Sequence, residues 1–203
     1  MSRLPIPTRD EAPAKSQPML DAVGSQLGVI PNLFRLVGQS PAALEGFLGL
    51  SSALNKTLDV KTRERIALAV AQVNGCAYCL SAHSYIGANL AKLDAAELAA
   101  NRHGHSNDAT ADAAVTFAKK VAEARGKVSE ADIAAVKRAG FADAQVVEIV
   151  LNVALNVLTN FVNNVADTDI DFPVGRMPPD RIPHPNHRRA EFGPQLPSKR
   201  FRS

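Results

Sequence analysis

The feature that most constrains the fold of this chain is a regular succession of helix start and stop signals between residues 17 and 167. Ser40 before Pro41 is one start, because serine caps free N–H groups and proline fits the first helical position. Glycines such as Gly28 and Gly75 provide stops, since they readily adopt the left-handed backbone that ends helices. These signals predict helices at about 17–27, 41–55, 60–74, 76–90, 95–102, 109–125, 130–139 and 143–167, with a short apolar segment at 33–37.

Composition supports an all-α fold. Hydrophobic residues make up 46% of the 203 residues but aromatic residues only 5%, and tryptophan is absent. Strands favour aromatic and β-branched residues, whereas this mixture of alanine, leucine and valine favours helices. We therefore expect one helical domain of about eight helices at 17–170, preceded by an extended arm at 1–16 and followed by a tail at 171–203.

The tail differs in composition from the rest of the chain. Seven of the thirteen prolines lie in the last 31 residues, and the segment from Phe172 onward carries a formal charge of +5, which leaves −2 for the remainder. A segment without a hydrophobic period cannot form its own core, so we expect it to be disordered or to wrap a neighbouring subunit. The acidic remainder gives no reason to expect nucleic-acid binding.

The sequence contains no obvious membrane signal. The first 17 residues lack the apolar stretch of a signal peptide, and the most apolar segment, 146–165, contains Glu148 and five asparagines. We therefore expect a soluble, cytoplasmic protein without a membrane partner. In that compartment a Cys-x-x-Cys pair is more often catalytic or metal-binding than a structural disulfide.

Both cysteines of the chain, Cys76 and Cys79, directly follow Gly75 and are followed by His83. On a helix these three side chains share one face, and His83 is one turn from Cys79. A helix start favours the thiolate, which is the reactive form of cysteine. Glu64 ends up near this turn if the two helices pack antiparallel, and a carboxylate there could orient the histidine as in a nucleophilic triad.

Other interpretations of the cysteine pair stay open. Zinc needs about four ligands, and His103 or His105 could complete a set with Cys76, Cys79 and His83, although three ligands on one straight helical face suit a tetrahedral metal poorly. The pair could also be purely structural. Haem attachment is excluded because Leu80, not histidine, follows Cys79.

Asparagines recur at near-helical spacing on the last helix. Two interpretations fit this stripe: a polar seam that lines a pocket or an interface, or the small polar face of an ordinary amphipathic helix. We favour the second. The stripe consists of Asn152, Asn156, Asn160 and Asn163 or Asn164.

The spacing of Glu64, Cys76, Cys79 and His83 resembles the signature of the alkylhydroperoxidase AhpD-like proteins in the carboxymuconolactone decarboxylase superfamily. The flanking residues 28–33, 40–41 and 141–165 resemble its peroxidase-related branch, and the resemblance covers about 20–172. It implies an all-α homo-oligomer that reduces hydroperoxides with a dithiol or lipoyl-type reductant and needs no bound cofactor or metal. This sequence has Tyr78 where the best-known member has a histidine.

The resemblance also implies roles for the four residues. Cys79 is then the peroxidatic cysteine, Cys76 resolves it as a disulfide, and His83 with Glu64 forms a proton relay. The helix start by itself favours Cys76 as the more acidic thiol, so which cysteine attacks first stays open. Two alternatives to a peroxidase also stay open: a thiol-disulfide sensor or carrier that uses the same pair, and a metal-binding or structural helical oligomer.

Overall fold

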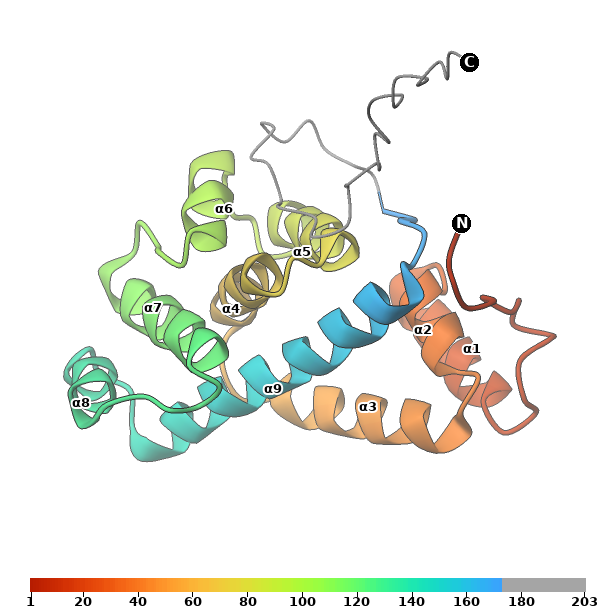
Figure 1. Ribbon diagram of the computed structural model, residues 1–203, viewed down its shortest axis with the longest axis horizontal. Coiled ribbons are helices and arrows are strands. Elements are labelled where there is room, and N and C mark those ends of the chain that lie inside the picture. The colour runs from red at the N-terminus through yellow and green to blue at the C-terminus, as the bar shows by residue number, and fades with distance from the viewer. Residues whose placement is uncertain (173–203) are drawn as a thin grey trace, which may run out of the picture.

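The computed structural model describes residues 1–172, and this part of the chain contains nine α-helices and no strand (Figure 1). The predicted all-α class is confirmed. The basic tail from residue 173 lies outside the described residues. The helices are α1 Gln17–Leu27, α2 Asn32–Val37, α3 Pro41–Leu54, α4 Val60–Val73, α5 Ala77–Asn89, α6 Ala95–Arg102, α7 Ala109–Glu123, α8 Glu130–Arg138 and α9 Asp143–Ala166.

The helix ends follow the chemistry of the sequence signals. The Ser40 side chain accepts the Ala43 N–H and starts α3, and Ser129 forms a reciprocal capping box at α8. Gly28 ends α1 with a left-handed φ of 77°. The apolar segment at 33–37, to which the sequence assigned no element, is the short helix α2, so the fold has one helix more than the predicted eight.

Helix α4 is the centre of the fold, with α5, α6, α7 and α9 arranged around it (Figure 1). Seven of its fourteen residues are buried. The main core joins α4, α7 and α9 through side chains that include Ile66, Val70, Phe117, Ile149 and Val153. Burying each large apolar side chain contributes about 1.5–3 kcal/mol. A second cluster surrounds the cysteines, so α5 is fixed to the same scaffold.

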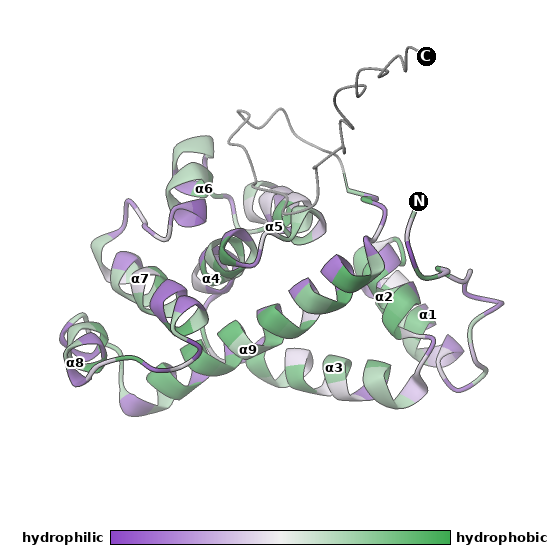
Figure 2. Cartoon of the chain, in the orientation of Figure 1, coloured by the Kyte–Doolittle hydropathy of each residue, from purple (hydrophilic) through white to green (hydrophobic). Residues whose placement is uncertain are grey.

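The asparagines of α9 face the protein interior, whereas we expected them to form the polar outer face of an amphipathic helix. Asn152, Asn156, Asn160 and Asn163 are buried, so the stripe is not a polar face in water. The opposite face is apolar and exposed, and hydrophobic residues run along the helix in Figure 2. By length and composition alone, α9 could cross a membrane, with a mean hydropathy of 1.5. The exposed apolar side chains are Val147, Val150, Leu151, Leu158, Phe161 and Val165.

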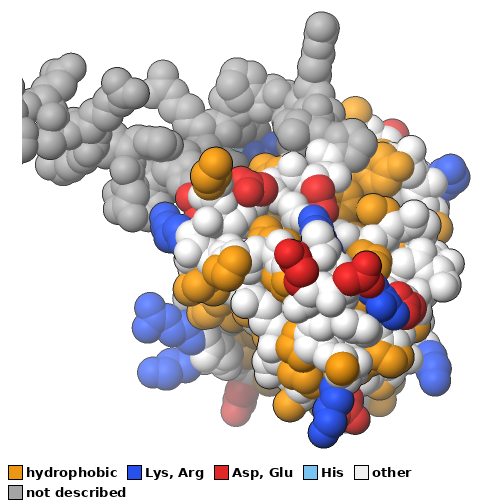
Figure 3. Space-filling model, turned by 90° about the vertical axis from the view of Figure 1, so that its right-hand side faces the viewer, with side chains coloured by type: hydrophobic (Ala, Val, Ile, Leu, Met, Phe, Trp, Pro, Cys, Tyr) orange, Lys and Arg blue, Asp and Glu red, His pale blue; other side chains and the backbone are white. Residues whose placement is uncertain are grey.

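The N-terminal residues 1–16 form no regular element but lie against the helical domain. The backbone N–H of Arg3 donates to the carbonyl of Ala166 at 2.6 Å, beside the C-terminal end of α9. Arg9 pairs with Asp21 of α1. On the molecular face shown in Figure 3, acidic and basic side chains are interspersed among hydrophobic ones.

Candidate functional site

The two cysteines lie at the turn between α4 and α5. Gly75 reverses the chain with a left-handed φ of 60°, and Cys76 is the N-cap of α5. The Cys76 sulfur accepts the backbone N–H of Cys79 at 3.2 Å, the place usually taken by a serine or aspartate oxygen. Cys76 and Cys79 form a disulfide with their Cα atoms 5.3 Å apart. The predicted helix start at Cys76 is therefore confirmed.

Glu64 returns to this region because α4 and α5 pack side by side. Its Oε2 lies 2.8 Å from Nδ1 of His83, and the two side chains are only 13% and 23% exposed. A carboxylate accepts hydrogen bonds, so this contact places a proton on Nδ1 and leaves Nε2 free to take or give a proton. Glu64 and His83, which lie 19 residues apart in the sequence, are thus in direct contact.

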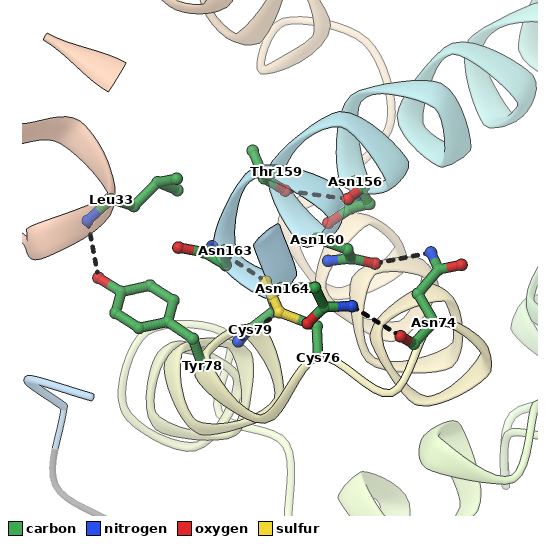
Figure 4. The surroundings of a disulfide bond; sticks show 10 residues. All are labelled: Leu33, Asn74, Cys76, Tyr78, Cys79, Asn156, Thr159, Asn160, Asn163 and Asn164. Carbon is green, nitrogen blue, oxygen red and sulfur yellow. Dashed lines mark hydrogen bonds between the residues drawn. A yellow bond between two sulfur atoms is a disulfide. The ribbon is translucent and has the colours of Figure 1, made fainter. Parts of the chain in front are cut away.

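Asn163 belongs to the site, although the sequence analysis named it only as part of the asparagine stripe and not among the four candidate site residues. Its Nδ2 donates to the sulfur of Cys79 at 3.3 Å, and its side chain is buried (Figure 4). Asn160, one turn earlier, instead accepts from Asn74 at 2.9 Å. A signal was present in the sequence: asparagines at helical spacing on an otherwise apolar helix are expensive to bury unless they meet polar partners.

Tyr78 lies between the cysteines in sequence, but its ring points away from them (Figure 4). Its hydroxyl accepts the Leu33 N–H at 3.2 Å and donates to Asp171 at 2.9 Å, and its ring forms a T-shaped pair with the ring of Phe172. Burial raises the pKa of the Tyr78 phenol far above its usual range, with a smaller contribution from Asp171. Tyr78 therefore stays protonated and ties α5 to α2 and to the segment after α9.

A second buried polar cluster lies beside α4 and centres on Glu97. Arg65 pairs with this carboxylate at 2.7 Å, and Ser106, Asn101 and the N–H of Asn107 also donate to it. Burial alone would raise the pKa of Glu97, but these hydrogen bonds outweigh it and lower the pKa to about 2. The cluster links α4, α6 and the loop before α7.

Access to the sulfurs is limited in this conformation. Cys76 is 0% exposed and Cys79 is 3% exposed. Two surface hollows, of about 360 Å³ beside α8 and about 320 Å³ between α4 and α6, have neither cysteine in their linings. Within residues 1–172 no group of three or more His, Cys, Asp or Glu side chains is arranged to hold a metal ion, and His103 and His105 are exposed.

The fold and the site define an all-helical protein with a buried cysteine pair at a helix start and a carboxylate–imidazole pair beside it. The model of the carboxymuconolactone decarboxylase family matches residues 40–124, which include all four predicted residues. An uncharacterised protein of Haemophilus influenzae is 48% identical over 48 residues, a match that spans 23% of this chain and only 42% of that relative.

Solved structures show the same fold over most of the chain. An uncharacterised peroxidase-related protein from Ralstonia eutropha, described as an alkylhydroperoxidase AhpD core, is 27% identical with a TM-score of 0.76, covering 87% of this chain and 97% of that one. A peroxidase-related protein from Silicibacter is 25% identical with a TM-score of 0.73, covering 83% and 91%. The chain thus resembles the AhpD-like proteins in fold, and its residues 40–124 match the carboxymuconolactone decarboxylase family.

The debrominase Bmp8 shares the fold at lower identity. It is 22% identical, with a TM-score of 0.68, and the match covers 84% of this chain and 91% of that one. A Cys-to-Ala variant of Bmp8 was solved in complex with 2,3,4-tribromopyrrole. A likeness of fold therefore does not fix the reaction, which has to be argued from the site.

Proposed function

We propose that this protein is a thiol-dependent peroxidase that reduces hydroperoxides through Cys76 and Cys79. The observation that carries the proposal is the disulfide between these residues at a helix start, with the Glu64–His83 contact one turn further along α5. The site holds one group for each step of such a reaction, namely a sulfur to attack, a second sulfur to resolve, and an imidazole to move protons.

The first step is attack by the Cys79 thiolate on the terminal oxygen of a hydroperoxide, ROOH. The O–O bond breaks, Cys79 is oxidised to sulfenic acid, and the alkoxide takes up a proton to leave as ROH. His83, one turn from Cys79, accepts the thiol proton beforehand and supplies one to the leaving group. Glu64 holds the imidazole in the tautomer that this proton transfer requires.

The second step closes the disulfide. The Cys76 thiol attacks the Cys79 sulfenic sulfur, a sulfur–sulfur bond forms, and water leaves. Their Cα separation of 5.3 Å lies within the range that disulfides span. A dithiol reductant, of the dihydrolipoyl or dithiothreitol class, then returns both cysteines to thiols by two exchange steps and becomes a disulfide itself.

The proposal also includes self-association. The outward face of α9 presents Leu151, Leu158 and Phe161, each at least 39% exposed, at spacings close to a heptad. On the adjacent helix α3, Gly46 and Gly49 have open space where a side chain would project. The large side chains on α9 of one copy could fill the open space beside the α3 glycines of a second copy. We therefore expect a homo-oligomer that associates through α3 and α9.

Hydroperoxide consumption with single-cysteine variants tests the reaction. Wild-type protein, Cys79→Ser and Cys76→Ser are supplied with a hydroperoxide and either dihydrolipoamide or dithiothreitol. We expect turnover by wild type and none by Cys79→Ser. Cys76→Ser should consume one equivalent when the reductant is omitted, because its sulfenic acid has no resolving cysteine. With a dithiol present it should turn over only as fast as the dithiol reduces the sulfenic acid directly. A disulfide that titrates reversibly without peroxide consumption would favour a thiol-disulfide sensor or carrier instead.

A further inference from the structure

We propose that Asn163 is a positioning residue: its amide stabilises the Cys79 sulfur as a thiolate in the reduced protein and so makes Cys79, rather than Cys76, the attacking sulfur. The first half of this inference concerns an ionisation and stands on geometry alone. The second half rests on the proposed peroxidase function.

The contact comes from outside the cysteine turn. Asn163 belongs to α9, 84 residues further along the chain than Cys79, and its Nδ2 lies 3.3 Å from the sulfur. The Asn163 side chain is 2% exposed and the Cys79 side chain 3%, so water does not compete strongly for the bond. An amide N–H therefore meets the sulfur in a dry site, where hydrogen bonds are stronger than in water.

The disulfide sulfur is a weak acceptor, whereas a thiolate is a strong one. The same amide therefore gains interaction energy when the disulfide is reduced and Cys79 ionises. The bond fixes the amide orientation, because a flipped Asn163 would place its Oδ1, an acceptor, against the sulfur. Oδ1 has no hydrogen-bond partner within the described residues, so only the donor side of this amide is used.

Cys76 has a different donor. Its sulfur accepts the backbone N–H of Cys79, as the N-cap of α5. That bond comes from the helix itself and is available to any residue at this position, whereas Cys79 is the cysteine that receives a side-chain amide among the described residues. The two sulfurs thus compete for thiolate character, and Asn163 shifts the balance toward Cys79.

Within residues 1–172, the other ionisable groups on the elements around this sulfur belong to α5 and its N-cap, to α4 and to the C-terminal end of α9. On α5 and its N-cap they include Cys76, His83 and Tyr78, whose hydroxyl faces Leu33 and Asp171 instead, and on α4 they include Glu64. Asp167, the C-cap of α9, follows Asn163 by one turn, but it is exposed and pairs with Arg3. All of these groups stay in place when Asn163 is replaced, so a change in Cys79 ionisation reports on the amide.

Asn160 provides the matched control. It lies on the same helix one turn earlier, it is 0% exposed, and its Nδ2 also lacks a partner within the described residues. Its bond goes to Asn74, not to sulfur (Figure 4). Replacement of Asn160, like that of Asn163, removes one buried side-chain amide, but it leaves the contacts of Cys79 unchanged.

The test measures Cys79 ionisation in a Cys76→Ser background, where serine keeps the N-cap and leaves one thiol. The thiolate ultraviolet absorbance is followed against pH. We expect Asn163→Leu to raise the Cys79 pKa by about one unit, the scale of one hydrogen bond to an ionised group, and the near-isosteric Asn163→Asp to raise it at least as much. Asn160→Leu leaves it within about 0.3 units. An unchanged pKa in both Asn163 variants, or an equal shift in Asn160→Leu, overturns the proposal.

A second measurement does not depend on whether the Asn163 variants fold. In the Cys76→Ser protein, the side-chain N–H signals of Asn163 are followed by NMR across the thiol titration. They move with the Cys79 ionisation if the amide donates to the thiolate. Signals that stay still through the titration refute the contact in the reduced state.

The choice of attacking sulfur is read from the reduced protein with both cysteines. Limiting iodoacetamide and mass spectrometry give the share of label on each cysteine, and we expect Asn163→Leu to move label from Cys79 to Cys76. If the pKa shift is found but wild type consumes no hydroperoxide, the role of Asn163 stands and the peroxidase proposal fails. If wild type consumes hydroperoxide but the Asn163 variants leave the Cys79 pKa unchanged, the peroxidase proposal stands and the role of Asn163 fails.

Discussion

Replacement of Glu64 by glutamine is the sharpest test of the proton relay. The carboxylate lies 2.8 Å from His83 Nδ1, and both side chains are mostly buried. Glutamine keeps the shape but replaces an ionised acceptor by a neutral amide. A hydrogen bond to a charged group is worth about 1.5–3 kcal/mol, which corresponds to a factor of roughly 10–150 in rate. We expect kcat/KM for hydroperoxide to fall by about that factor.

A double-substitution cycle decides whether the two residues act together. If Glu64 works by orienting His83, then Glu64→Gln costs little more in a His83→Gln background, because residues that act as a unit are not additive. Exposed Glu45 on α3 provides the control, and Glu45→Gln keeps the wild-type rate. Wild-type activity in Glu64→Gln, or losses that simply multiply in the double variant, would refute the relay.

Three further predictions concern stability and assembly. The Glu97 pKa of about 2, against an ordinary 4.5, contributes about 3 kcal/mol of folding stability that is present above pH 4.5 and is lost as the pH falls toward 2; unfolding curves for wild type should show this loss and Glu97→Gln should not. Tyr78→Phe removes the partner of the Leu33 N–H and of Asp171, so it should lower the free energy of unfolding by about 1–2 kcal/mol while the Cys79 pKa stays at its wild-type value. Phe161→Glu places a charge on the exposed face of α9 and should turn the oligomer into monomer by light scattering, whereas a wild type that is already monomeric would contradict the expected association.

Local chemistry explains why so much of the helical framework could be predicted. Capping residues such as Ser40 and stop residues such as Gly75 act within one turn of the backbone, so their effect can be read without knowing the fold. The start of α5 at Cys76 and the shared face of Cys79 and His83 follow from the same short-range rules. The segment that became α2 lacked a cap of this kind, and its N-cap, Pro31, makes no side-chain capping bond.

Long-range contacts could not be predicted in the same way. Glu64 was expected near His83 only on the condition that two helices pack antiparallel. Asn163 meets Cys79 because α9 packs against α5, which no local pattern specifies. The interpretation of the asparagine stripe was wrong for a related reason: helical periodicity tells which residues share a face, but not whether that face meets water or another helix. Here the face with asparagines lies inside and the apolar face outside.

A stoichiometric measurement decides whether the cysteine pair reduces hydroperoxide at all. Reduced wild-type protein is freed of reductant and mixed with excess hydroperoxide, and the loss of peroxide and of free thiols is counted per chain. We expect one hydroperoxide to disappear for two thiols lost, with Cys76 and Cys79 recovered as one intramolecular disulfide by mass spectrometry. Loss of both thiols without loss of hydroperoxide beyond a protein-free control, or no thiol loss at all, would contradict the proposed reaction.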